Sequence, residues 1–239
     1  TLVQIPFGKN ILIDCGPKGF GEAASYIKSK GIRCLDIIYL SHLDADHSGG
    51  LDEILSSVKV KKIVLPYTYA LTDSVTDFLS AAAKHGFNIE FADDTYTEKI
   101  ENCTITGLWP GENIASDANG NSLVLMLSYG DKSVLFTGDL DVLSESSVIL
   151  QGKDIDADIL KIAHHGSSSS TSAEFIEKTS PEIAVISVAK NNSYGHPHKD
   201  VLNRLEAYGC RILRTDKNGY IHFSEDILGN FKIKMKSPN

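Results

Sequence analysis

Short runs of aliphatic and β-branched residues alternate with amphipathic stretches along the chain. In the first half, this pattern predicts strands at 10–14, 36–40 and 62–65 and helices at 19–30, 51–58 and 72–85. Strands that alternate with helices are typical of an α/β fold. We therefore expect a sheet that carries its helices on one outer face.

The second half repeats this theme. A strand-rich block covers 88–91 and 103–137, and its last part resembles a hairpin of 122–128 and 133–137. Further strands are predicted at 158–162, 183–188, 211–213 and 220–223, and helices at 142–150, 172–178 and 199–208. Two such α/β halves would pack into a four-layer αββα sandwich. Because no linker-like segment divides them, we expect a single domain over 1–239.

Composition restricts the function. The chain has 239 residues, 42% of them hydrophobic, and 31 acidic against 23 basic side chains give a formal net charge of −8. This balance argues against a protein that coats nucleic acid along a basic stripe. No segment approaches the roughly eighteen apolar residues that span a bilayer. Because the sequence starts at Thr1 without a methionine, we expect an excised or processed domain whose membrane part or leader is missing.

The cysteines offer no recognisable site. Cys15, Cys34, Cys103 and Cys210 lie far apart and form no CxxC spacing, which argues against a zinc knuckle or a redox dithiol. We interpret them as buried free thiols.

Six of the eight histidines lie in three short segments rich in Gly, Ser and Asp, and the first segment follows a predicted strand. It offers His42, Asp44, Asp46 and His47 as metal ligands. In an extended segment, alternate side chains point the same way, so the first three should share a face, with a turn bringing His47 beside them. The glycines at 49 and 50 should then let the backbone turn into a helix. One such loop can supply ligands to two adjacent cations.

Two other interpretations apply to this loop. As a calcium loop that starts at Asp44, it would need a glutamate where Leu55 stands, so an EF-hand is excluded. A polar loop can also collect such residues by chance, with Asp44 capping a turn.

The remaining candidate ligands also lie near predicted strand ends. Asp139 follows the apolar strand 133–137, where an acid is either a metal ligand or the N-cap of the next helix. His164 and His165 follow strand 158–162. His196 and His198 precede a helix N-terminus, which is suited either to anion binding or to a simple capping turn.

Three other patterns favour ordinary structure. The Gly-x-Gly-x-x-Ala match at 19–24 lies too far from its strand, and no acid follows near twenty residues on, so it indicates a helix start. The serines at 167–170 lack a nucleophile elbow. The lysines at 59, 61 and 62 and at 232, 234 and 236 are typical of solvated strand edges.

The sequence resembles the metallo-β-lactamase fold superfamily and, more narrowly, the C-terminal hydrolase domain of the ComEC family of DNA-internalisation competence proteins and its stand-alone relatives. The matching segments run in family order at 11–16, 42–50, 121–125, 135–139, 161–167 and 194–198. The family's opening strand, with its Gly-Gln-Gly-Asp stretch, is missing from this sequence.

The resemblance implies a two-metal site. His42 and Asp44 would bind one ion, Asp139 would bridge, and the other ion would be bound by Asp46, His47 and His164. We choose His164 over His165 because it directly follows the strand.

Two departures from the superfamily affect the first ion. Asp44 stands where most members have histidine, and no histidine precedes Asn121, where Asp117 or Asn119 would be a weak substitute. Carboxylate ligands favour harder cations. We therefore expect two divalent ions, Mn or Zn, with Mn favoured.

The resemblance further implies hydrolysis of a phosphodiester, with DNA as the expected substrate and a link to DNA uptake. Asp46 would orient the attacking water, and His196 or His198 would bind the phosphate or protonate the leaving group. The alternatives are hydrolysis of a lactone, β-lactam, phosphocholine ester or cyclic nucleotide, and a non-catalytic domain that guides DNA. A competence role implies the outer face of the cell membrane or secretion; any other role implies the cytoplasm.

Overall fold

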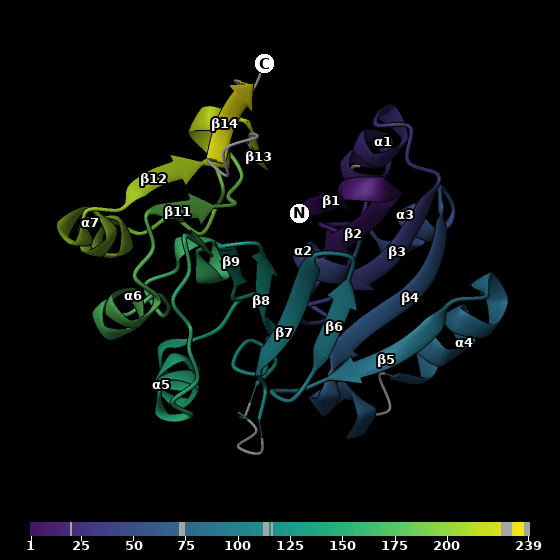
Figure 1. The fold of residues 1–239 in the computed structure, drawn as a ribbon, viewed down its shortest axis with the longest axis horizontal. Helices are drawn as coiled ribbons and strands as arrows, with labels where there is room; N and C mark the ends of the chain where they lie inside the picture. Colours follow the sequence, from purple (N-terminus) through teal and green to yellow (C-terminus); the bar gives the residue numbers. More distant parts are fainter. Residues whose placement is uncertain (20, 72–74, 112–114, 116, 226–230, 237–239) are drawn as a thin grey trace. The chain divides into compact units, whose positions relative to one another are not determined.

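The computed structural model describes residues 1–239 except 20, 72–74, 112–114, 116, 226–230 and 237–239 (Figure 1). The chain divides into two compact units, Thr1–Val124 and Leu125–Asn239, termed unit 1 and unit 2. The single domain over 1–239 stays a prediction. Within the described residues, no helix has both the length and the apolar character needed to cross a membrane.

Unit 1 contains a five-stranded sheet in the order β1-β2-β3-β4-β5. The strands β2 to β5 run parallel, and β1 is antiparallel to β2. Parallel neighbours need long crossovers, which here contain the helices. The strands are β1 (Leu2–Ile5), β2 (Lys9–Ile13), β3 (Cys34–Tyr39), β4 (Lys59–Pro66) and β5 (Asn88–Ala92), and the helices are η1 (Pro6–Gly8), α1 (Glu22–Ser29), α2 (Ala45–Ser48), α3 (Leu51–Leu55), η2 (Tyr67–Leu71) and α4 (Val75–His85).

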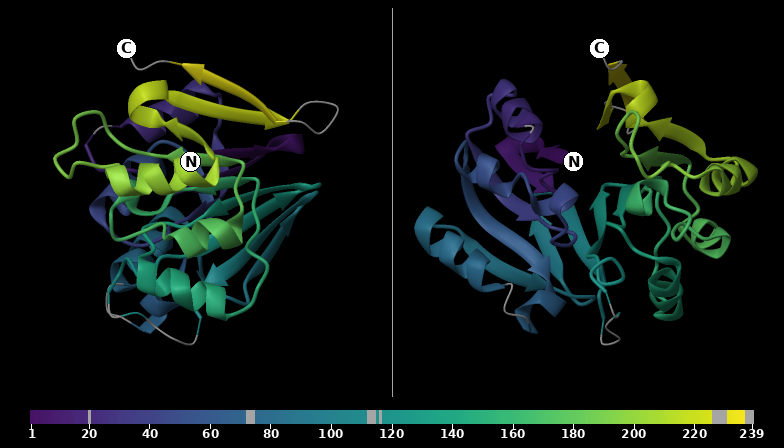
Figure 2. Two further views of the ribbon diagram at one scale, coloured as in Figure 1. Left: turned by 90° about the vertical axis from the view of Figure 1, so that its left-hand side faces the viewer. Right: turned by 180° about the vertical axis from the view of Figure 1, so that it is seen from behind.

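The helices α1, α3 and α4 lie on the same side of this sheet (Figures 1 and 2). Ile27 of α1 and Ile54 of α3 are buried there in one cluster with Leu35, Ile63 and other strand residues. The hairpin β6 (Thr97–Ile100) and β7 (Cys103–Trp109) follows β5. The hydroxyl oxygen of Tyr39 on β3 lies 3.2 Å from that of Tyr96, which directly precedes the hairpin.

Unit 2 repeats this arrangement. Its strands follow the order β8-β9-β10-β11-β12, and every pair is parallel except the hairpin β8–β9. Helices α5, α6 and α7 connect the parallel strands and lie along one face of the sheet (Figure 1). The strands are β8 (Val124–Tyr129), β9 (Lys132–Phe136), β10 (Ile159–Lys161), β11 (Ile183–Ile186) and β12 (Arg211–Arg214), and the helices are α5 (Val142–Leu150), η3 (Ala163–Gly166), α6 (Ala173–Thr179) and α7 (Lys199–Tyr208).

A second hairpin, β13 (Tyr220–Glu225) and β14 (Phe231–Lys236), follows α8 (Thr215–Asn218) at the end of unit 2. One face of this hairpin packs on the sheet core. Ile221, Phe223 and Ile233 contact a cluster that contains Ile159 and Leu213.

Most of the predicted elements are confirmed within a few residues. The first three residues of the predicted helix 72–85 lie outside the described part of the chain. The four-residue helices α2 and α8 and the strand β6 were not predicted, because elements this short depend on tertiary contacts more than on their own sequence pattern. The four cysteines are free, as expected, with Cys34 only partly buried. The glycine-rich start of α1 is held by Glu53, whose carboxylate accepts hydrogen bonds from the N–H groups of Gly19 and Gly21.

Candidate metal-ligand groups

The candidate ligands follow the carboxyl ends of parallel strands in both units. In unit 1, Asp14 follows β2 and the loop 41–47 follows β3; in unit 2, Asp139 follows β9 and His164 follows β10. Ligands of α/β proteins bind at this edge of the sheet. The strand order of each unit therefore places its candidate ligands at one edge of its sheet, independently of any sequence motif.

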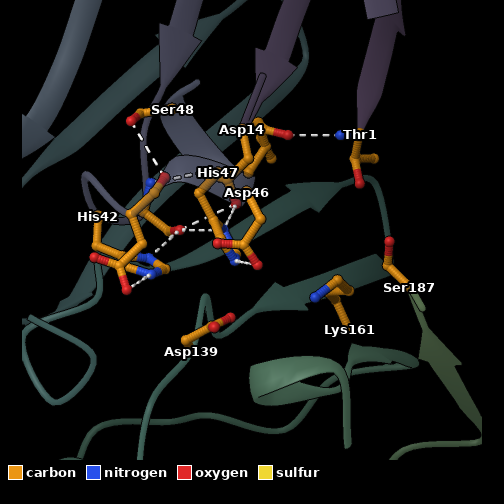
Figure 3. A network of polar contacts seen from close by, with 12 residues as sticks. Thr1, Asp14, His42, Asp46, His47, Ser48, Asp139, Lys161 and Ser187 are labelled. Atoms are coloured by element: carbon orange, nitrogen blue, oxygen red, sulfur yellow. Dashed lines mark hydrogen bonds and ion pairs between the residues drawn. The ribbon is translucent and has the colours of Figure 1, made fainter. Parts of the chain in front are cut away.

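The loop of unit 1 is extended as far as Asp44 and then becomes helical. Asp46 lies in α2 rather than in an extended segment, so the prediction that alternation places it on one face with His42 and Asp44 is wrong. The short helix α2 places the carboxylate of Asp46 beside His47, whereas that of Asp44 lies beside His42 (Figure 3). An Oδ2 atom of Asp44 lies 3.7 Å from Nε2 of His42, and that of Asp46 lies 3.8 Å from Nε2 of His47.

The two glycines after this loop permit close packing rather than an unusual turn. Both have ordinary helical backbone angles. A Cβ atom on Gly49 would lie 2.8 Å from the backbone nitrogen of Lys18, and one on Gly50 would lie 2.6 Å from the carbonyl oxygen of Cys15. The predicted reason for these glycines is therefore corrected: they let the loop pack against the end of β2.

Asp14 supports the histidines of this group. Its Oδ2 lies 2.9 Å from Nδ1 of His47, and its carboxylate also accepts the backbone N–H (2.8 Å) and the hydroxyl (3.0 Å) of Ser41. Burial alone raises the pKa of Asp14, but its contacts with His47 and Ser41 bring the pKa below the ordinary value. A carboxylate that binds the second nitrogen of a histidine is typical of metal sites. Asp14 was missed as a site residue, although its position directly after a strand was a usable signal.

The loop 117–123, which precedes β8, is hydrogen-bonded to the candidate ligand loop of unit 1. The N–H of Leu123 donates to the carbonyl of Ser41 (2.7 Å). Within that loop, Asp117 accepts the N–H of Gly120 at 2.8 Å, so one of its oxygens holds the turn. Oδ1 of Asn119 is buried and has no hydrogen-bond partner among the described residues. Of the two predicted substitutes, Asn119 is therefore the one whose side-chain oxygen is buried without a hydrogen-bond partner among the described residues.

In unit 2, Asp139 lies beside two histidines. It is only 3% exposed, and its Oδ2 lies 3.7 Å from Nε2 of His164 and 4.0 Å from Nε2 of His165. The alternative role of helix cap belongs to Asp141, whose carboxylate accepts the N–H of Ser144. The side chain of Asp139 is thus directed to the histidines.

The two histidines differ in their support. Nδ1 of His165 donates to the carbonyl oxygen of Ser187 at 2.6 Å, which leaves Nε2 as the ligand atom. Nδ1 of His164 is buried, with no hydrogen-bond partner in the described part of the chain. Both residues have left-handed backbone angles, and His164 N–H donates to the carbonyl of Gly138. His165 was not among the predicted ligands; the preference for His164 stays a prediction.

The His-Pro-His loop packs against these residues. A Cβ atom on Gly166 would lie 2.6 Å from Cβ of Pro197, and the N–H of His198 donates to the carbonyl of Gly166. The ring of His196 lies 5.7 Å from that of His164 and 5.5 Å from that of His198, measured between centroids. Burial lowers the pKa of His196, and its neighbouring imidazoles lower it further. His198 occupies the N-cap position of α7, yet its side chain makes no capping hydrogen bond.

Glu145 and Arg204 hold the loop that follows the two histidines. Glu145, which is fully buried, accepts the N–H groups of Thr171 and Ser172. Arg204 donates to the carbonyls of Ser170 and Thr171 at 3.0 and 2.9 Å. The hydroxyl of Ser170 in turn donates to the carbonyl of Ala163. Glu145 and Arg204 thereby fix the segment in which His164 and His165 lie.

Both groups fit divalent cations. In each group an imidazole is fixed through Nδ1 while its Nε2 faces a carboxylate oxygen, at 3.8 Å for His47 with Asp46 and at 4.0 Å for His165 with Asp139. Mixed imidazole and carboxylate ligands suit zinc and manganese. The buried Nδ1 of His164 offers a further donor atom.

Comparisons with known proteins give several matches. The Metallo-beta-lactamase superfamily matches residues 1–190. The ComE operon protein 3 of Bacillus subtilis is 37% identical over 220 residues, which cover 91% of this chain and 28% of that protein. The competence protein ComA of Neisseria gonorrhoeae is 32% identical over 231 residues, which cover 95% of this chain and 30% of that protein. The chain thus spans under a third of the length of these relatives.

Solved structures show the same fold. The metallo-beta-lactamase fold protein YhfI of Bacillus subtilis superposes with a TM-score of 0.59 at 14% identity, over 89% of this chain and 87% of that chain. Tm1679, described as a metal-dependent hydrolase of the beta-lactamase superfamily, gives 0.56 at 14% identity, over 85% of each chain. At this identity the likeness concerns the fold alone. The predicted α/β sandwich of the metallo-β-lactamase fold is confirmed.

Proposed function

Because the chain belongs to the metallo-beta-lactamase superfamily, we propose that it is a metal-dependent phosphodiesterase or nuclease that uses two divalent cations. The observation that carries this proposal is the paired arrangement of histidine and carboxylate. His47 is backed by Asp14 and faces Asp46, and His165 is backed by a backbone carbonyl and faces Asp139. Such backing fixes the ring and its tautomer for metal binding.

The proposed ligands come from both groups, which would act in one reaction as the family resemblance implies. One ion would be bound by His42 and Asp44, a second by Asp46, His47 and a histidine of η3, and Asp139 would be shared. When bound, such cations lower the pKa of water and neutralise the charge of a phosphate.

The residues of the chain would then position the reactants. Asp46 is exposed, so its carboxylate can accept a hydrogen bond from the attacking water. His196 lies beside His164, and His198 lies beside His196, so either can donate to a phosphate oxygen or protonate the leaving alkoxide. Asp14, behind His47, has a positioning role.

The names of the homologues support DNA as the substrate. Of the two relatives above 30% identity, one is a competence protein by name and the other is named as a ComE operon protein. A role in DNA uptake would place the domain at the outer face of the cell membrane, linked to a membrane domain, or in the secreted fraction. Cytoplasmic location would suit a hydrolase of another small ester.

Replacement of Asp139 by alanine tests this proposal. We expect cleavage of a linear DNA to fall by more than the 10–100-fold that the loss of an outer metal contact typically causes. The control is Asp131→Ala, which removes an exposed acid of the same unit. Unchanged cleavage by Asp139→Ala would refute its role, and nitrocefin hydrolysis without nuclease activity would favour the β-lactam alternative. DNA binding by wild-type protein without any hydrolysis would favour the guiding domain.

Metal identity and the choice of histidine need separate measurements. Because Asp44 is a hard ligand, we expect activity to be restored best by Mn²⁺, and Asp44→His to shift the preference toward Zn²⁺. Metal-by-metal reconstitution measures this; full activity with one tightly held Zn²⁺ would contradict it. Comparing metal stoichiometry in His164→Ala and His165→Ala identifies the ligand of η3, and the ligand variant should lose an ion.

A further inference from the structure

The hairpin β13–β14 presents two chemically different faces. The register pairs Tyr220 with Lys236, His222 with Lys234 and Ser224 with Lys232. Directly paired residues of an antiparallel ladder lie on the same face. The neighbouring positions Ile221, Phe223 and Ile233 pack against the core of unit 2, so the six paired residues lie on the face turned away from that core.

This outer face is basic and aromatic. The lysines at 232, 234 and 236 and the imidazole of His222 are exposed, and the ring of Tyr220 is 57% exposed. The six residues of the face include no carboxylate. The acid just before the hairpin, Asp216, is bound by Arg214 through two hydrogen bonds of 2.9 and 2.6 Å, so its charge is compensated. The face is therefore cationic in a chain whose net charge is −8.

The other lysine run of the sequence lies among carboxylates. Lys61 binds Asp36 at 2.7 Å, and Lys62 binds both Glu90 and Glu98. Their charges are compensated, as expected for a solvated strand edge. The alternating lysines of β14 are exposed and lie about 6.8 Å apart along one face.

We propose that the outer face of the β13–β14 hairpin binds single-stranded nucleic acid, with the lysines on successive phosphates and a base stacked on Tyr220. Basic residues that follow the backbone, together with an exposed ring, are the features by which proteins bind single strands without sequence preference. A duplex hides the faces of its bases, so the single strand is the better fit. This inference rests on the proposed function for its biological role, as a substrate-holding surface.

Binding is measured with the whole chain in chelator, so that neither metal binding nor cleavage contributes. Fluorescence anisotropy of a labelled twenty-nucleotide single strand, over a series of salt concentrations, should show tighter binding than the duplex of the same sequence. Lys234→Gln/Lys236→Gln should weaken it at least tenfold and reduce the slope of log K against log salt by about 1.4, since each lost phosphate contact contributes about 0.7.

Two further variants separate stacking and charge. Tyr220→Ala should weaken binding by about fivefold to a hundredfold, whereas Tyr220→Phe, which keeps the ring, should bind like wild type. Lys28→Gln/Lys59→Gln removes the same charge from exposed lysines of unit 1 and should change affinity less than twofold. Circular dichroism and thermal melting confirm that each variant folds.

Several outcomes overturn the inference: no binding by wild type, equal losses in the unit 1 control, or an unchanged salt slope. Binding to anionic phosphatidylserine vesicles, but not to the single strand, would assign the face to a lipid surface. Self-association of the lysine variant with unchanged affinity would assign the lysines to protection of the strand edge. Hydrolysis of bis(p-nitrophenyl) phosphate with metal is measured in parallel: its absence refutes the proposed function, while strand binding reports only on the hairpin.

Discussion

The two ligand groups are held in place by different kinds of atoms. In unit 1 a side chain, the carboxylate of Asp14, holds both His47 and Ser41. In unit 2 backbone carbonyls hold the histidines: Gly138 accepts from the N–H of His164, and Ser187 accepts from the ring of His165. A side-chain support can be removed by one substitution, whereas a backbone support moves only when the surrounding packing changes.

The groups also differ in how they are assembled. The ligands of unit 1 come from one short loop and the end of the neighbouring strand. Those of unit 2 come from separate segments between 139 and 198, joined by the close approach of Gly166 to Pro197. Substitutions of the supporting residues should therefore act on metal affinity first in unit 1 and on stability first in unit 2.

The largest effect on stability is expected for Glu145→Ala. It leaves the N–H groups of Thr171 and Ser172 without an acceptor in a buried place, at a cost of about 3 kcal/mol in the free energy of unfolding. Urea denaturation measures this. Glu174→Ala, an exposed acid on α6, is the control and should change stability by less than about 0.5 kcal/mol. Equal results for the two variants would contradict the role of Glu145 in fixing the histidine segment.

Gly166→Ala should come next, at about 2 kcal/mol. Its φ of +83° disfavours any side chain, and the new Cβ would overlap Pro197. Gly195→Ala, in the adjoining loop, has a similar φ of +72° but no atom within 4 Å of the new Cβ, so it should cost only about 1 kcal/mol. If both variants lose the same stability and activity, packing between the two loops does not support the second group.

Asp14→Asn should act mainly on the first group. Loss of the carboxylate behind His47 should weaken binding of divalent metal by about 10–100-fold, with a smaller effect on stability. Competition with a chromophoric chelator measures the affinity. The matched variant Asp36→Asn changes a carboxylate of β3 that binds Lys61 and should leave metal affinity unchanged.

The smallest effect is expected from His196. Because its pKa in the folded protein lies below the unfolded value of 6.5, the unfolded state binds more protons, and stability falls as the pH drops below 6.5. Metal-free His196→Gln should therefore lose less stability than wild type between pH 7.5 and 5. His85→Gln, an exposed histidine of unit 1, is the control. Parallel curves for His196→Gln and wild type would contradict the predicted pH dependence.

Sequence reasoning identified the strands that deliver the ligands, because a buried strand has a hydrophobic run and its polar end is conspicuous. It also named His42, Asp139 and the three histidine segments as candidate ligands, which stays a prediction. It missed the supporting role of Asp14 and the fixed ring of His165, since both depend on contacts between residues far apart in the chain: Asp14 with His47, and His165 with Ser187.

The sequence by itself determined the α/β pattern, the order of the ligand segments and the chemical class of their donors, because periodicity and residue type are local properties. Only the tertiary structure decided that α2 separates Asp46 from the extended loop, that Asp141 caps α5 in place of Asp139, and that the lysines of β14 lie on an outer face with Tyr220. Each of these depends on strand register or on a packing contact, and a contact between distant residues leaves no periodic signal in the sequence.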